Sequence, residues 1–188
     1  MERNLLQTDD SLIVESAGLV QSPILASLED ETPVDIVTFI DSDRYLNRRN
    51  ETFDSVRWVL EVFYHPERHL EELREVGAPE EVLQDPYFNE LVCLIGMRSL
   101  KSVASAIMVL YETYKMLCLP NPQQAFNLMT GTPIFCTCCA TAARQAGDTV
   151  FTYVKNFFQT SPWFVAYAEE LSRHKDIQHK PYFAMNES

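Results

Sequence analysis

The chain has 188 residues, of which 46% are hydrophobic and 22% are charged. This composition excludes an intrinsically disordered chain, and the length suits one domain or two small packed subdomains. The formal net charge of −12 argues against nucleic acid as a partner, but that charge is unevenly distributed. Residues 1–43 carry ten acids and one base, whereas residues 91–188 have a small positive net charge. The acidity is therefore mainly a property of the N-terminal part of the chain.

Helices are predicted throughout the first half of the chain from apolar periodicity and proline positions. Thr32-Pro33 is interpreted as the N-cap and first residue of a helix through Val34–Phe39, with Asp35 in its first turn. The following pattern predicts helices over 52–64 and 67–76, and Pro79 predicts a short turn over 80–84. Gly77 stands where a left-handed residue normally ends a helix.

A long central core helix is predicted from Tyr87 to about Leu119, because apolar residues recur there at three- and four-residue spacing. Further helices are predicted at 133–145, 149–159 and 163–174. Glycine is scarce, with 5 residues in the whole chain, as in helical proteins. The sequence therefore predicts an all-α fold of two packed helical subdomains with roughly eight to ten helices and no required sheet.

The subdomain boundary is placed at residue 64. Residues 1–64 form an N-terminal subdomain that holds the acidic segment, and residues 65–188 form the middle and C-terminal subdomain. The longest uncharged stretch, residues 116–143, contains three prolines, so we do not expect it to span a membrane. Position 2 is Glu and not Gly, so we do not expect myristoylation. The chain does not start with a basic region followed by an apolar run, so we do not expect a secretory signal.

Signatures of catalysis and of metal binding are weak. The sequence has no glycine-rich phosphate loop, no G-x-S-x-G elbow and no H-E-x-x-H. His65 and His69 have the spacing of two ligands on one helix face, but Pro66 places His65 before the helix. Cys136 belongs to a cluster of three cysteines, at 136, 138 and 139, with no second ligand pair nearby. We therefore expect no enzyme activity, no metal and no cofactor, and we interpret these cysteines as small buried residues in a reducing compartment.

The densest basic feature of the sequence follows the acidic segment. Three arginines fall within six residues and a fourth follows on the next predicted helix, and guanidinium groups bind phosphate bidentately. The candidate lipid- or phosphate-binding residues are Arg44, Arg48, Arg49 and Arg57. The alternative interpretation is that Arg44, Arg48 and Arg49 neutralise the surrounding acids, which are Asp41, Asp43, Glu51 and Asp54.

Two segments together resemble the orthomyxovirus (influenza-type) matrix proteins. Residues 42–49, S-D-R-Y-L-N-R-R, resemble the family's S-E-R-x-L-Q-R-R loop between two N-terminal helices. Residues 103–111, A-S-A-I-M-V-L-Y after Val103, and residues 136–146, around C-T-C-C-A, are similar to the family's pair of core helices. The acidic stretch 67–90 stands where influenza-type proteins carry a basic R-K-L-K-R, and no histidine pair follows the cysteines. The resemblance is therefore to a divergent member, such as that of a fish-infecting isavirus.

That resemblance implies a structural viral matrix protein that self-assembles under the envelope and acts in budding. Its implied partners are further copies of itself in a lattice or filament, anionic inner-leaflet lipids, the viral ribonucleoprotein or nucleoprotein, and envelope glycoprotein tails. The implied locations are the virion beneath the envelope, the host cytoplasm, the inner face of the plasma membrane and the nucleus. Lipid would be bound weakly by each protomer through Arg44, Arg48, Arg49 and Arg57 and strongly by the assembled array.

Two other functions are weighed against the matrix hypothesis. The first is a helical host-interaction module that captures a partner helix in an aromatic groove. The groove residues would be Phe151, Phe157, Phe158, Trp163, Phe164 and Tyr167. The second is a thiol or metal enzyme built on the Cys136 cluster.

Overall fold

The structure is a computed structural model that describes residues 31–94, 101–129, 131–137 and 147–173. Within these ranges all regular structure is helical and there is no strand, which confirms the predicted all-α fold. The α-helices are α2 (Ile36–Asp41), α3 (Asp54–Tyr64), α4 (Leu70–Glu75), α5 (Glu80–Gln84), α6 (Lys101–Leu117), α7 (Pro122–Ala125), α9 (Thr152–Thr160) and α10 (Pro162–Arg173). Two short turns, the 3₁₀-helix η3 (Pro66–Arg68) and the π-helical η4 (Gly147–Phe151), precede α4 and α9.

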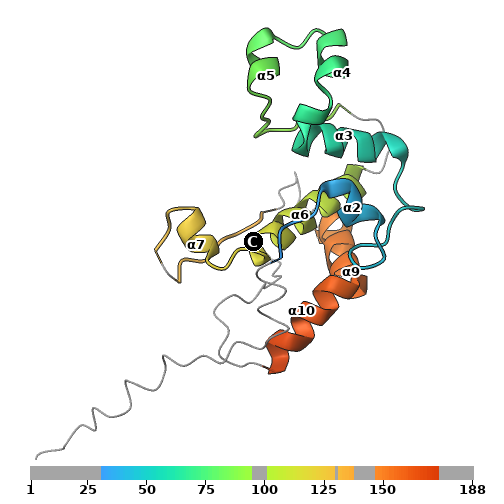
Figure 1. Cartoon of the computed structure of the whole chain (residues 1–188). Coiled ribbons are helices and arrows are strands. Elements are labelled where there is room, and N and C mark those ends of the chain that lie inside the picture. The colour runs from blue at the N-terminus through green and yellow to red at the C-terminus, as the bar shows by residue number, and fades with distance from the viewer. Residues whose placement is uncertain (1–30, 95–100, 130, 138–146, 174–188) are drawn as a thin grey trace, which may run out of the picture.

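Helix α6 runs through the middle of the molecule (Figure 1). Helices α2, α3 and α9 pack against it, and α10 packs against α9. Helices α4 and α5 lie beyond α3 at one end of the molecule, and α7 lies on a loop at its side (Figure 1). None of the helices in the described ranges is long and apolar enough to cross a bilayer. The subdomain boundary at residue 64 stays a prediction.

Helix α6 supplies more core residues than any other described element, because its apolar residues recur at helical spacing and so share one face. The buried residues of α6 are Val103, Ala106, Ile107, Leu110, Tyr111, Tyr114 and Leu117. Full burial of one large apolar side chain contributes about 1.5–3 kcal/mol. The second half of the predicted central helix is therefore present and forms the centre of the core.

Phe39 of α2 lies at the centre of an aromatic cluster and is completely buried. Its ring centroid lies 5.0 Å from that of Tyr114, 5.2 Å from Tyr111, 5.9 Å from Tyr45 and 6.4 Å from Phe164. Aromatic pairs of this kind contribute about 0.5–1.5 kcal/mol beyond the area that they bury. The cluster joins α2, α6 and α10, which are far apart in the sequence.

Two tyrosines of α6 hold the segment that leads into α2. The Tyr111 hydroxyl donates a hydrogen bond to the Val34 carbonyl oxygen at 2.8 Å, and the Val34 N–H donates to the Tyr114 hydroxyl at 3.2 Å. Burial raises the pKa of both tyrosines, so their hydroxyls stay protonated at neutral pH. These bonds satisfy the backbone of Val34 where no helix is available to do so.

The start of α2 differs from the sequence prediction. Asp35 is the N-cap, and its carboxylate accepts hydrogen bonds from the Val37 and Thr38 N–H groups, each at 3.1 Å. The Thr38 hydroxyl also donates to this carboxylate, at 2.8 Å. Because the Val34 backbone is bound to the two α6 tyrosines, the helix begins after Asp35, whose carboxylate satisfies two free N–H groups, and not after Thr32.

The predicted helix over 67–76 is interrupted at His69, whose backbone (φ −124°, ψ 26°) leaves the helical region. Its C-terminal end is as predicted, because Gly77 is left-handed with φ of 84°. The Gly77 N–H donates to the Arg74 carbonyl and the Ala78 N–H to the Leu73 carbonyl, the Schellman pattern. The predicted short turn over 80–84 is a short α-helix, α5.

Two predicted helical segments are absent. Residues 87–94 have no regular secondary structure, so the long helix does not begin at Tyr87. Phe88 and Leu91 turn toward α3 instead, whereas Leu94 is 98% exposed, so the apolar residues of this stretch do not share a face with those of α6. Residues 133–137 are also non-helical, and the rest of the helix predicted to 145 lies outside the described residues.

Candidate functional site

Two of the four candidate arginines are paired with carboxylates on neighbouring segments. The Arg44 guanidinium lies 2.8 Å from the Glu31 carboxylate, and Arg57 lies 2.8 Å from Asp41. Hydrogen bonds to Asp41 are the main cause that raises the pKa of Arg57. These contacts fit the alternative interpretation, in which the arginines neutralise nearby acids.

Arg48 has a packing position that the sequence does not indicate. Its guanidinium pairs with Glu51 at 2.8 Å, donates to the Thr160 hydroxyl at 2.7 Å and lies 4.8 Å from the centre of the Phe157 ring. It therefore joins the loop after α2 to the end of α9. Arg49 is exposed and has no ion pair with a described residue. Phosphate binding by these arginines stays a prediction.

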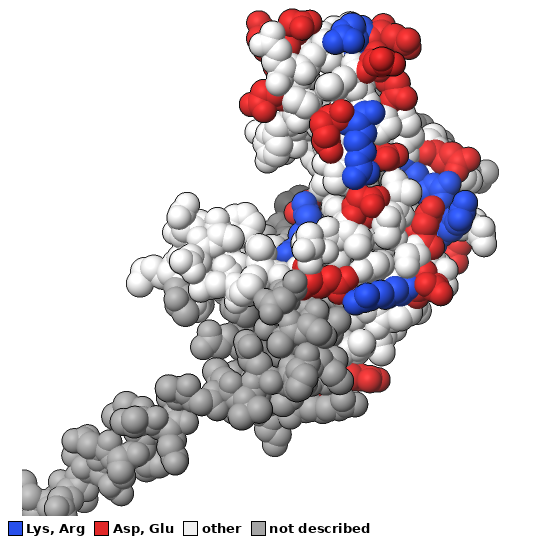
Figure 2. Space-filling model, in the orientation of Figure 1, with Lys and Arg blue, Asp and Glu red and all other residues white. Residues whose placement is uncertain are grey.

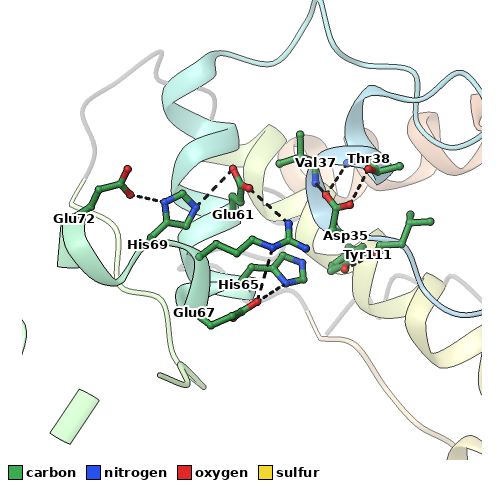
Figure 3. Close-up of polar contacts among 11 residues, drawn as sticks. Asp35, Val37, Thr38, Glu61, His65, Glu67, His69, Glu72 and Tyr111 are labelled. Carbon is green, nitrogen blue, oxygen red and sulfur yellow. Dashed lines mark hydrogen bonds and ion pairs between the residues drawn. The ribbon is translucent and has the colours of Figure 1, made fainter. Parts of the chain in front are cut away.

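The two histidines face carboxylates (Figure 3). His65 Nδ1 lies 3.4 Å from Glu67, His69 Nε2 lies 3.8 Å from Glu61, and His69 Nδ1 contacts Glu72. As expected, His65 precedes the helical turn that Pro66 begins. No three His, Cys, Asp or Glu side chains among the described residues are arranged to hold a metal ion. These contacts join η3 and the start of α4 to Glu61 of α3.

The cysteines within the described ranges are Cys93, Cys118 and Cys136, and none of these forms a disulfide. Cys118 is buried, and burial raises the pKa of its thiol to about 12, so it is protonated at neutral pH. Cys136 is exposed, contrary to the prediction of a small buried residue, because the segment around it is not helical. Positions 138 and 139 lie outside the described residues.

The predicted aromatic groove is wrong for most of its residues, which form the core, although Phe158 and Phe164 also line an open hollow of about 330 Å³ where α9 meets α10. Trp163, Phe164 and Tyr167 are at most 2% exposed and belong to the main hydrophobic cluster. Phe157 is 6% exposed, and Phe151 and Phe158 are half-buried. Aromatic residues at helical spacing were read as a binding face, but α9 and α10 turn that face onto α6 and α2.

A different apolar surface is open to solvent beside α3. A hollow of about 250 Å³ lies between this helix and the irregular segment 86–94. One wall is formed by Trp58, Val59, Val62 and Phe63, and the other by Phe88, Glu90 and Leu91. Trp58 is 47% exposed, and its ring lies edge-on to that of His69 at 6.4 Å.

Sequence reasoning missed this hollow for a specific reason. Residues 52–64 were predicted only as a helix, and residues 87–94 as the start of the central helix. The hollow exists because segment 86–94 is not helical and lies along α3. The available sequence signal is Trp58 itself, which lies off the buried stripe of α3 that Leu60 marks.

Acidic residues are concentrated on the segment that follows α3. The stretch 65–92 carries eight acids and two arginines, a net charge of −6. Figure 2 shows carboxylates gathered over the end of the molecule where α4 and α5 lie, with few cations among them. Of these acids, Glu90 is in the lining of the hollow. The candidate site is therefore an apolar hollow with one carboxylate in its lining, on a molecule with an acidic end, and we name it the α3 hollow.

Comparison with known proteins gives one match. A protein-family model described as "Uncharacterized protein MJ0330, N-terminal P-loop domain" matches residues 20–187. No curated protein and no solved structure matches the chain.

The resemblance to orthomyxovirus matrix proteins is wrong, because the family model that matches most of the chain is that of a different family. The segments that carried the resemblance are short helical strings, and such strings recur in unrelated helical proteins. The viral matrix function that this resemblance implied is therefore wrong as well. The partners and locations that it implied stay untested predictions.

The family's description names a P-loop, which holds nucleotide phosphates on a glycine-rich turn between a strand and a helix. The residues of this chain do not fit such a site. None of its five glycines is followed by lysine, and the described residues contain no strand. Gly77 and Gly131 are the described glycines with positive φ. Gly77, however, ends a helix and does not begin one, and Gly131 is followed two residues later by Pro133. With residues 20–187 matched, the chain belongs to the family described as "Uncharacterized protein MJ0330, N-terminal P-loop domain", although it lacks the phosphate loop of that description.

Proposed function

We propose that the chain is a non-enzymatic helical module that binds a peptide segment of a partner protein in the α3 hollow. The observation that carries the proposal is the position of Trp58, which is 47% exposed on the wall of an apolar hollow. The other tryptophan, Trp163, is 2% exposed within the core. Tryptophan is one of the residue types enriched among binding hot spots, which supports a recognition role.

The size and lining of the hollow suit side chains of a protein partner. About 250 Å³ lies below the usual range for small-molecule sites, about 300–1,000 Å³, but accommodates one or two large apolar side chains. Six of its seven lining residues are apolar, and the seventh is Glu90. Tyr87 and Val92, on the segment beside the hollow, are 76% and 75% exposed and extend the apolar surface.

The proposal includes that the chain does not bind nucleotides. The family's description contains a P-loop, but this chain has no G-x-x-x-x-G-K-[ST] sequence to hold phosphates. We therefore expect neither ATP nor GTP, with or without Mg²⁺, to raise the melting temperature of the full chain. Saturable stabilisation by either nucleotide would contradict this part of the proposal.

The binding proposal is tested by selecting peptides on the immobilised full chain from a random display library. Selected peptides are then measured in solution against the wild-type chain, Trp58→Ala and Tyr153→Ala. Tyr153 is the matched control because it is an aromatic residue of similar exposure, 41%, on α9. Far-UV circular dichroism and thermal melts check that both variants are folded.

Peptides are expected to bind the wild-type chain and Tyr153→Ala equally and to lose at least about tenfold in affinity for Trp58→Ala. Acrylamide quenching adds an independent measurement, since the emission lost in Trp58→Ala should be readily quenched in the free chain. The proposal is refuted if no selected peptide depends on Trp58. It is also refuted if Trp58 is shielded from acrylamide, because another segment of the chain then covers the hollow.

A further inference from the structure

The charge around the α3 hollow is unbalanced, and this points to the chemistry of a partner. Of the eight acids in 65–92, Glu67 and Glu72 contact Arg68, His65 or His69. The other six have no ion pair with any described residue. They are Glu71, Glu75, Glu80, Glu81, Asp85 and Glu90.

One carboxylate belongs to the lining of the hollow. Glu90 is part of the wall formed by segment 86–94. On the other wall, the Trp58 ring lies beside that of His69, which contacts the Glu61 and Glu72 carboxylates on its far side (Figure 3). A cation placed in the hollow would therefore meet the Glu90 carboxylate and the Trp58 indole.

The secondary structure around the hollow favours a helical partner. An extended peptide is usually bound by adding a strand to a sheet edge, and the described residues offer no strand. Helix α3 presents Trp58, Val59, Val62 and Phe63 along an 11-residue helix, which is about 16 Å long. That length matches two to three turns of a partner helix whose apolar residues recur at three- and four-residue spacing.

We propose that the occupant of the α3 hollow is an amphipathic helix of a partner protein, with apolar residues on one face and lysines or arginines beside them. This proposal rests on the proposed function and adds the charge and shape of the partner. The apolar face fills the hollow against Trp58, and the cations face Glu90 and the unpaired carboxylates of α4 and α5. Complementary charge chiefly sets specificity and association rate in such complexes.

The test uses three synthetic peptides with the same leucine positions and length but different polar faces, carrying lysine, glutamine or glutamate. Fluorescence anisotropy with the full chain measures each affinity at low and at high salt. The lysine peptide is expected to bind at least about tenfold tighter than the glutamine peptide at low salt and the glutamate peptide weakest. The advantage of lysine should narrow at high salt because exposed charges are then screened.

Two charge reversals provide a matched pair of variants. Glu90→Lys changes the charge on the hollow wall, and Asp43→Lys makes the same change at an exposed acid in the loop after α2. Glu90→Lys is expected to weaken the lysine peptide at least about threefold and to leave the glutamine peptide nearly unchanged. Asp43→Lys should leave both peptides nearly unchanged, and thermal melts show whether both variants are folded.

The outcomes separate this inference from the proposed function. If the three peptides bind alike and all depend on Trp58, the hollow binds helices without charge selection and the inference is overturned, while the proposed function stands. If binding of none depends on Trp58, both are overturned. A concentration-dependent dimer that is lost in Trp58→Ala would identify a second copy as the occupant and would also overturn the inference.

Discussion

Replacing Asp35 by alanine tests how α2 is held in place. The carboxylate accepts two backbone N–H groups at 3.1 Å and the Thr38 hydroxyl at 2.8 Å. Loss of such an N-cap typically costs about 1 kcal/mol and at most about 2 kcal/mol. We expect Asp35→Ala to lower the free energy of unfolding by this amount, measured by urea denaturation. Asp43→Ala, an exposed acid without a described hydrogen bond, should change it by less than about 0.5 kcal/mol.

The same variant should show a defined pH dependence. Burial alone would raise the pKa of Asp35, but the hydrogen bonds from Thr38 and the nearby charges of Arg68 and His65 together outweigh burial and hold the pKa below its ordinary value of 3.8. The carboxylate therefore stabilises the fold above about pH 4, and this contribution is lost as the pH falls through the lowered pKa. The difference between wild type and Asp35→Ala should be largest near about pH 7 and shrink below about pH 4. Equal stability of Asp35→Ala and Asp43→Ala at neutral pH, or a difference independent of pH, would refute the reasoning.

Three further changes test the core, the tyrosine contacts and the end of α4. Phe39→Ala removes the centre of the aromatic cluster and should cost about 3–5 kcal/mol by urea denaturation; a loss below about 1 kcal/mol would contradict its central position. Tyr111→Phe leaves the Val34 carbonyl without its donor and should lower the free energy of unfolding by about 1 kcal/mol. An unchanged free energy of unfolding would contradict this and would mean that water replaces the hydroxyl. Gly77→Ala forces a left-handed alanine at φ of 84° and should lower stability by about 1–2 kcal/mol in thermal melts, although no neighbouring atom opposes the new methyl group. A neutral or stabilising Gly77→Ala would show that the end of α4 rearranges freely.

Local features of the fold were predictable where a single residue type determines the backbone. Gly77 ends α4 because only glycine adopts its φ without cost, and Pro79 begins the turn over 80–84, which is α5 in the structure. The apolar face of α6 was predictable over 103–117 because its spacing persists for several turns. The N-cap of α2 was not, since Thr32 and Asp35 are both good capping residues and tertiary contacts of Val34 with α6 decide between them.

The candidate site was less predictable than the fold. Periodicity identifies an apolar face but not what covers it, so the aromatic residues of α9 and α10 were read as a groove although they pack in the core. Conversely, the predicted helix over 52–64 did not distinguish Trp58 from its neighbours, and the exposure of Trp58 depends on where segment 86–94 lies. The arginines were chosen for charge alone, and the structure adds that Arg44, Arg48 and Arg57 each face a carboxylate.

The sequence by itself determined the helical class, the sites of several helix ends and the acidic character of residues 65–92, because these depend on local backbone preference and on composition. The tertiary structure decided which apolar faces are buried, since each helix can bury its stripe only against a partner that lies far away in the sequence. It buried Trp163 against Tyr114 of α6 and left Trp58 exposed beside an irregular segment. The distinction between core and binding surface in this protein is therefore a property of packing, which local sequence patterns do not contain.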